Sequence, residues 1–239
     1  MSKTAIMRPL DQSGSYGIKE TAMRHHRFTI LAGTALAALA LTAPGLAQDS
    51  ETREFAGFTA IDANGGYELV VVQGETFSVE LVGDADDFDD IEIEVERGTL
   101  EIDQDTGWFS RRHSLDVVVQ VTMPLIEELD FGRGLSAEVS GIDSEQLDVD
   151  VSTGASVRLS GSCNALEIDA STGTSLNARN LICARVNVDA STGASVSAHA
   201  TEASDASASM GASVRIHGNP PSRHASSSMG GSVSHSAGG

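Results

Sequence analysis

Apolar and polar residues alternate along most of the second half of the chain. In three successive segments, apolar residues stand seven, five and three positions before a glycine, and again three and five positions after it. They are Leu147, Val149, Val151, Val157 and Leu159; Leu166, Ile168, Ala170, Leu176 and Ala178; and Val186, Val188, Ala190, Val196 and Ala198. A period of two places these residues on one face of a β-strand. Each segment therefore predicts a strand, a glycine turn and a second strand.

The turns repeat nearly the same residues at a fixed spacing. Three copies read Ser-Thr-Gly-x-Ser and two read Ser-Met-Gly-x-Ser, and their glycines are Gly154, Gly173, Gly193, Gly211 and Gly230. Glycine suits such a corner because it accepts positive φ. One short unit cannot bury its apolar face alone, whereas stacked copies share a continuous core. We therefore expect a parallel β-solenoid of about five coils, with serine and threonine hydroxyls stacked in ladders beside the turns.

The preceding residues show shorter alternating runs, which predict strands at 58–61, 67–72, 77–82, 91–95, 99–102 and 114–121. Turn residues such as Asn64-Gly65-Gly66 and Arg97-Gly98 separate them, and short turns of this kind favour antiparallel hairpins. We expect a single all-β domain over 58–239. It comprises a hairpin-rich part at 58–125 and solenoid repeats at 126–235, and a linker at 48–57 precedes it.

Residues 1–47 have the pattern of an export signal. A basic segment at 24–27 precedes an apolar run at 28–41, and small residues at 43–47 provide a cleavage site. The part upstream of Met23 is long for such a signal, so Met23 is an alternative start. The apolar run is short for a membrane span. We expect an exported protein without a transmembrane segment after cleavage, in the periplasm or on the outer surface of a Gram-negative-type bacterium.

The exported chain is strongly acidic. Of 15 basic and 34 acidic residues, cleavage after Ala47 removes five and two, which leaves a net charge of −22. Nucleic acid is therefore excluded as a natural partner. Asp150, Asp169 and Asp189 each precede a turn glycine by four positions, so stacked coils align them about 4.8 Å apart. A bound cation such as calcium, raised pKa values or solvent must relieve their repulsion. We expect no other cofactor.

Two further sets of residues carry expectations. Cys163 and Cys183 occupy nearly equivalent places on adjacent coils, so we expect a disulfide, with two stacked free thiols as the alternative. Trp108, Phe109, Arg111 and Arg112 form an aromatic and basic loop, which suits contact with a sugar or a carboxylate. The alternative is a hairpin tip whose aromatic rings cover one end of the core.

The order of several motifs resembles a known family. These motifs are Phe58-x-x-Ile61, Tyr67-x-Leu-Val-Val-Val-Gln-Gly74, Gly98-x-Leu-x-Ile102, Val119-x-Val-x-Met-Pro124 and the later train of Gly-x-Ser-Val phrases. Together they resemble the bacterial family DUF2807, also described as the head "GIN" domain of an auto-transporter adhesin, over about residues 55–237. The resemblance implies a β-solenoid at the cell surface or in the periplasm and an adhesive role. It supplies no catalytic residues.

We therefore expect a non-catalytic binding or adhesion module whose partner is a protein or glycan surface. Two alternatives stay open: a structural or envelope-stress protein that binds another protein, and an enzyme that uses the acidic rows on polysaccharides. Catalysis is disfavoured because no basic residue shares those rows and the histidines lack metal-ligand spacing. The thin C-terminal coils would leave an open sheet edge, through which self-association is expected.

Overall fold

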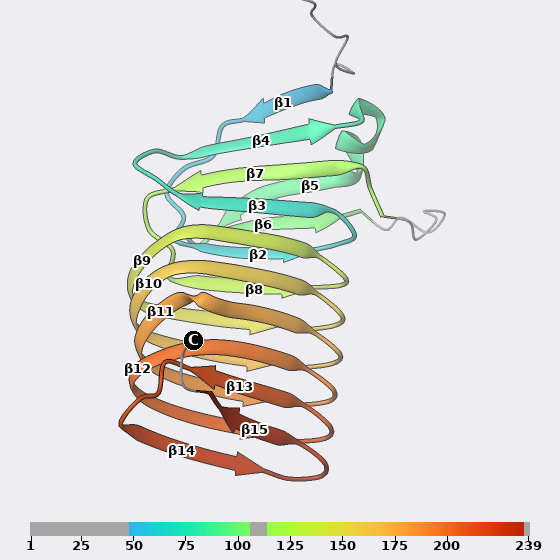
Figure 1. Ribbon diagram of the computed structural model, residues 1–239. Coiled ribbons are helices and arrows are strands. Elements are labelled where there is room, and N and C mark those ends of the chain that lie inside the picture. The colour runs from blue at the N-terminus through green and yellow to red at the C-terminus, as the bar shows by residue number, and fades with distance from the viewer. Residues whose placement is uncertain (1–47, 106–113, 237–239) are drawn as a thin grey trace, which may run out of the picture. The chain divides into compact units, whose positions relative to one another are not determined.

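The computed structural model describes residues 48–105 and 114–236. Within these ranges the chain is almost entirely β-structure, wound into a flattened solenoid (Figure 1). Its elements are β1 (Asp49–Arg53), β2 (Ala60–Asn64), β3 (Glu68–Gln73), β4 (Ser78–Gly83), the 3₁₀ helix η1 (Ala85–Asp90), β5 (Ile91–Glu96), β6 (Thr99–Gln104), β7 (Val117–Met123), β8 (Glu128–Gly132), β9 (Ser136–Val151), β10 (Ser156–Ala170), β11 (Ser175–Ala190), β12 (Ser195–Ala208), β13 (Ser213–His217), β14 (Ser222–Ser227) and β15 (Ser232–His235). An antiparallel region followed by a parallel solenoid was predicted, and this prediction is confirmed.

The strands form two layers. Each of the long strands β9–β12 bends, so that its first half lies in one layer and its second half in the other. Layer 1 has the order β1-β4-β7-β3-β9-β10-β11-β12-β13-β15. Layer 2 has the order β5-β6-β2-β8-β9-β10-β11-β12-β14. The alternating apolar side chains point between the layers and form one continuous core, as their period of two predicts.

Turns of one kind lead from layer 2 to layer 1 and lie above one another on one side of the molecule (Figure 1). In the first Ser-Thr-Gly copy, both Thr153 (φ 52°) and Gly154 (φ 78°) have positive φ, which is the pattern of a type I′ turn. The amide of Gly154 also donates to the carbonyl of Thr172 in the next coil, at 3.1 Å. A β-branched residue in this conformation is an outlier that costs about 1–2 kcal/mol. The hydrogen bonds between coils offset that cost.

The antiparallel pairs of the first part are β1 with β4, β4 with β7, and β5 with β6. Two strands of this part do not pair as successive antiparallel hairpins would. β2 lies parallel to β6 and β8, and β3 lies parallel to β7 and β9, so these two strands already form a coil of the solenoid. The chain leaves this coil, builds β4 and β5 farther out, and returns to insert β6 and β7. Among the turns that the structure describes, only Arg97-Gly98 closes the short hairpin that its residues predict.

The structure also differs from the sequence analysis at residues 48–57, where a linker was expected. This segment contains β1, which pairs antiparallel with β4 at the edge of layer 1. Four of its five side chains are exposed, so no hydrophobic alternation could reveal the strand. The predicted signal segment 1–47 lies outside the described residues. Within the described residues, no helix is long and apolar enough to cross a membrane.

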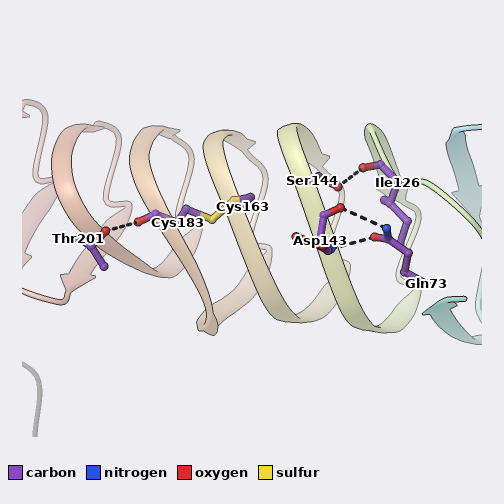
Figure 2. The surroundings of a disulfide bond; sticks show 7 residues. All are labelled: Gln73, Ile126, Asp143, Ser144, Cys163, Cys183 and Thr201. Atoms are coloured by element: carbon purple, nitrogen blue, oxygen red, sulfur yellow. Dashed lines mark hydrogen bonds between the residues drawn. A yellow bond between two sulfur atoms is a disulfide. The ribbon is translucent and has the colours of Figure 1, made fainter.

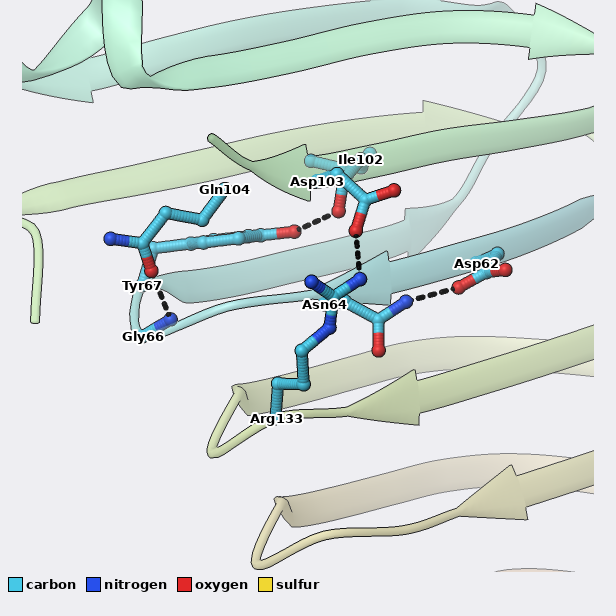
Figure 3. A network of polar contacts seen from close by, with 8 residues as sticks. All are labelled: Asp62, Asn64, Gly66, Tyr67, Ile102, Asp103, Gln104 and Arg133. Atoms are coloured by element: carbon cyan, nitrogen blue, oxygen red, sulfur yellow. Dashed lines mark hydrogen bonds and ion pairs between the residues drawn. The ribbon is translucent and has the colours of Figure 1, made fainter. Parts of the chain in front are cut away.

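A polar network fastens the first coil to its neighbours (Figure 3). Arg133, in the turn before β9, forms an ion pair of 2.6 Å with Asp103 of β6, and thereby spans the intervening strand β2. The hydroxyl of buried Tyr67 donates to the carbonyl of Ile102 at 2.7 Å. The amide of Gly66 donates to the side chain of Gln104 at 2.9 Å. These contacts hold layer 2 in register where the repeats have not yet begun.

The core thins toward the C-terminal end, as predicted. The inward residues of β12 include Ala206 and Ala208, and every residue of β14 is exposed. Buried Ser204 makes a hydrogen bond of 3.2 Å with the ring of His235. Small side chains therefore replace Val, Leu and Ile where the stack ends, which is typical of terminal repeats.

Candidate binding face

The outer face of layer 2 carries a row of carboxylates that runs from β5 to β11. Residue-for-residue pairing places each carboxylate beside the next one along the solenoid axis. In spatial order the row consists of Glu94, Glu101, Asp62, Asp130, Asp150, Asp169 and Asp189. We call these seven residues the carboxylate row. Neighbouring strands lie about 4.8 Å apart, so each charge has a like charge on one or both sides.

The last three members of this row were predicted from the repeats, and the structure places them in register. The other four members, Glu94, Glu101, Asp62 and Asp130, were not predicted. These four lie in the first part of the chain or just before the repeats, at strand positions that no Gly-x-Ser phrase marks. Their alternation with apolar residues was visible, but the pairing of β2 with β6 and β8 was not.

The environment of the row raises the pKa of most of its members. Partial burial, followed by the charges of Asp62, Asp150 and Glu128, raises the pKa of Asp130 to about 6. Burial and then neighbouring carboxylates also raise the pKa values of Asp150 and Asp169. Desolvation and like charge both disfavour the ionised carboxylate. The row therefore takes up protons at a higher pH than isolated carboxylates would.

A second, mixed row runs beside the first. Pairing along layer 2 aligns Glu128, Asp148, Glu167, Asn187, Asp205 and His224. Two shallow grooves of about 430 Å³ each follow these rows. The first row's groove includes Asp130, Asp150 and serines of the turns, whereas the second row's groove includes Glu167, Arg185 and Asp205. The result is an extended, polar and strongly acidic surface with repeated spacing.

The carboxylates stand in a line and do not converge on one point. Among the described residues, no three or more His, Cys, Asp or Glu side chains form a group that could hold a metal ion. Asp150, Asp169 and Asp189, the candidate calcium ligands, accordingly lie side by side along the face. They offer a partner a series of separate acidic contacts.

At the opposite edge of the face, the chain bends from layer 1 back into layer 2. Cys163 and Cys183 are in register there and form a disulfide, with their Cα atoms 4.5 Å apart (Figure 2). Nearby, the amide of Asp143 donates to Gln73 at 2.9 Å and the hydroxyl of Ser144 donates to the carbonyl of Ile126 at 2.6 Å. A groove of about 880 Å³ passes over this edge. The disulfide and the hydrogen bonds tie successive coils together beneath it.

The aromatic and basic loop that the sequence analysis considered for ligand contact lies outside the described residues. Trp108, Phe109, Arg111 and Arg112 all belong to it. β6 ends shortly before this loop and β7 begins shortly after it. The role of this loop stays a prediction.

A solved structure of another protein shares this fold. A putative adhesin from Bacteroides fragilis matches 81% of this chain and 99% of its own length, with a TM-score of 0.63 and 17% identity. A putative adhesin from Parabacteroides merdae matches 79% of this chain and 96% of its own, with a TM-score of 0.48 and 14% identity. A search of curated proteins gives no match. The family model described as "Putative auto-transporter adhesin, head GIN domain" matches residues 57–220, and the chain therefore belongs to this family.

Proposed function

We propose that the protein is an exported, non-catalytic binding module of the cell envelope, which contacts its partner through the carboxylate row. The observation that carries this proposal is the row itself, because seven outward carboxylates stand in register across both parts of the fold. Membership of an adhesin-like family supports a binding role. The export signal predicted at residues 1–47 supports a place outside the cytoplasm.

Binding explains the row better than catalysis does. A carboxylate enzyme sets two acids in different environments, so that one donates a proton while the other stays ionised. Here the raised pKa values of Asp130, Asp150 and Asp169 share the same causes, which are partial burial and neighbouring carboxylates. Arg133, whose charge acts on Asp62 of the row, is already paired with Asp103. The face repeats one chemistry, as a surface for an extended partner does.

The chemistry of the row selects a partner with repeated positive groups. An array of carboxylates at a regular spacing attracts cations and gains affinity when several contacts form on one molecule. An amine-bearing polysaccharide or a basic protein surface has this property. Chitosan oligomers, whose sugars carry amino groups, are a suitable probe, and fully acetylated chitin oligomers supply the same backbone without the charge.

The test uses the chain without residues 1–47, since residues 46–239 form one compact unit. Chitosan oligomers are expected to bind, and chitin oligomers are not. Replacement of Asp130, Asp150 and Asp169 by Asn should weaken binding by about tenfold or more, because each lost pair is worth roughly half a kcal/mol. The matched control replaces three outward carboxylates of layer 1 by Gln.

These control residues are Glu68, Glu80 and Glu138, so both variants change the net charge by the same amount. An effect of equal size in the two variants would mean that net charge alone attracts the oligomer, and the assignment of the face would fail. Equal binding of chitin would exclude a charge-based contact altogether.

A further inference from the structure

From β10 onward, the outer face of layer 1 differs in charge from the acidic outer face of layer 2. Within layer 1, none of the outward positions of the described strands β10–β13 and β15 holds a carboxylate. They hold Ser156, Arg158, Ser160, Ser175, Asn177, Arg179, Ser195, Ser197, His199, Ser213, Arg215, His217, Ser232 and Ser234. The exported chain has three times as many acidic as basic residues. A face with only hydroxyl, amide and basic side chains therefore stands out.

Four basic side chains gather at one edge of this face. His199 and His217 are paired in register on β12 and β13, and the ring of His199 lies 3.3 Å from the carbonyl oxygen of Arg179. Burial, followed by the charges of Arg179, His199 and Arg215, lowers the pKa of His217. We call Arg179, His199, Arg215 and His217 the basic corner. Within the described part of the chain, none of the four forms an ion pair, and neither does Glu202, the next carboxylate along β12.

The corner contains a buried polar atom without a partner. Nδ1 of His217 lies 2.8 Å from the hydroxyl of Ser236, whereas its Nε2 is buried and has no hydrogen-bond partner. Gly218 makes room for this arrangement, since a Cβ there would lie 2.6 Å from the ring of His199. An unpartnered buried group and unpaired like charges both cost stability. A bound anion would relieve the like charge of the exposed basic side chains around this ring.

A ladder of serines runs along the solenoid at the other edge of this face, where the layer 1 strands begin. Strand pairing aligns Ser136, Ser156, Ser175, Ser195, Ser213 and Ser232 on the same outer face. Hydroxyls at a spacing of about 4.8 Å can hydrogen-bond to successive sugar units, while the basic corner holds an acidic group. A polymer with repeated anionic sugars fits this combination better than a single small anion does.

We propose that layer 1 binds an anionic polysaccharide strand, whose carboxylates or sulfates lie at the basic corner and whose hydroxyls contact the serine ladder. This site lies in the other layer from the carboxylate row and has the opposite charge, so it goes beyond the proposed function above. A chain with both sites bridges an acidic glycan and a positively charged partner.

The test titrates the chain without residues 1–47 with polygalacturonate oligomers, using neutral dextran oligomers as the uncharged probe. Polygalacturonate binds despite the net negative charge of the protein, and dextran does not. The double substitution Arg179→Gln and Arg215→Gln lowers the affinity about tenfold or more, since two charge-assisted contacts are lost. Arg97→Gln together with Arg185→Gln is the control. It removes the same charge from exposed sites elsewhere and changes the affinity less than about twofold.

The pH dependence supplies a second readout. Arg179, His199 and Arg215 face His217, and burial followed by their charges lowers the pKa of its imidazole, so this ring takes up its proton only as the pH falls below the usual histidine range. Binding therefore strengthens as the pH falls, and the gain shrinks in His217→Gln, which keeps an uncharged polar side chain at the corner. Constant affinity as the pH is lowered would contradict the role of His217.

Three outcomes overturn the proposal. The first is no binding of polygalacturonate at low ionic strength, and the second is equal weakening by the control pair. The third is a change in sedimentation of the free protein when Arg179 and Arg215 are replaced, without any change in polygalacturonate affinity. That third result would mean that the basic corner binds the acidic face of a second copy of the chain.

Vesicles of anionic phospholipid serve as a further probe. Binding to them that polygalacturonate does not displace would assign the corner to a membrane surface instead.

Discussion

Removal of one charge from the carboxylate row should stabilise the protein. Asp130 stands between Asp62 and Asp150 in register, and Asp130→Asn keeps its shape while it removes the charge. Like charges placed opposite each other on a sheet destabilise it by roughly 0.2–1 kcal/mol per pair. Two such pairs are relieved, and solvent screens a carboxylate that is only partly buried, so the expected gain is about 0.5–1 kcal/mol. In a chain of this size, such a gain raises the melting temperature by about 1–4 °C.

The pKa of Asp130 fixes the sign and range of the pH dependence. Its folded-state pKa is raised from 3.8 to about 6, so the native state binds the proton more tightly than the unfolded state does. Stability of the parent protein therefore falls as pH rises through this interval. The advantage of Asp130→Asn should be absent below about pH 4, develop between the two pKa values and be complete above about pH 6.

The assay is urea or thermal unfolding of both proteins at several pH values, in low and high sodium chloride. Glu138→Gln is the matched control, because Glu138 lies on the other layer of the same long strand β9 and its register neighbours are Val70 and Arg158. It should be neutral or slightly destabilising. Equal stabilisation by both substitutions would trace the effect to net charge, and a loss of stability in Asp130→Asn at pH 8 would refute the reasoning outright.

Three more outcomes follow from the backbone, the disulfide and the row. Gly161→Ala should destabilise the protein by about 3 kcal/mol or more, because the added Cβ would lie 2.2 Å from the carbonyl oxygen of Ile142. Gly154→Ala should cost only about 1–2 kcal/mol, since the surroundings of Gly154 are open. Urea unfolding would show this ranking, and equal losses of stability would contradict it. Replacement of both Cys163 and Cys183 by Ser should lower the free energy of unfolding by about 3 kcal/mol and make stability insensitive to reductant. If alkylation changed the intact mass of the parent protein equally with and without reductant, the disulfide would be ruled out. Calcium should raise the melting temperature no more than sodium chloride of equal ionic strength, because the carboxylates do not converge; a saturable excess with calcium would make the row a metal site.

The repeats were predictable because each copy shows the same local pattern of apolar, polar and glycine residues. Leu166, Ile168 and Ala170 alternate with outward residues, and the following glycine marks the turn, so strand, turn and buried face all follow from a short window. Equal spacing then sets the register, which aligned Asp150, Asp169 and the cysteines. The backbone conformation of Thr153 could not be predicted from the sequence. Its positive φ is supported by hydrogen bonds between coils and opposes the usual preference of a β-branched residue.

The first part of the chain was predictable only strand by strand. Its alternating runs marked β3 and β4 within two residues, but alternation gives no information on which strands become neighbours. β2 meets β6 and β8, both far from it in sequence, through backbone hydrogen bonds that any side chains permit. The upper half of the carboxylate row depends on such pairings, and therefore emerges only from the folded chain.

Covalent footprinting of carboxylates tests the central claim most directly, because it reports which face the partner covers. The carboxylates are esterified with a diazo compound, which does not couple them to the amines of chitosan, in the protein alone and with saturating chitosan oligomers, and labelled sites are located by mass spectrometry. The account predicts protection of Asp130, Asp150 and Asp169 on layer 2, with unchanged labelling of Glu68 and Glu138 on layer 1. Equal protection of both faces, or protection of layer 1 alone, would contradict the carboxylate row as the contact surface.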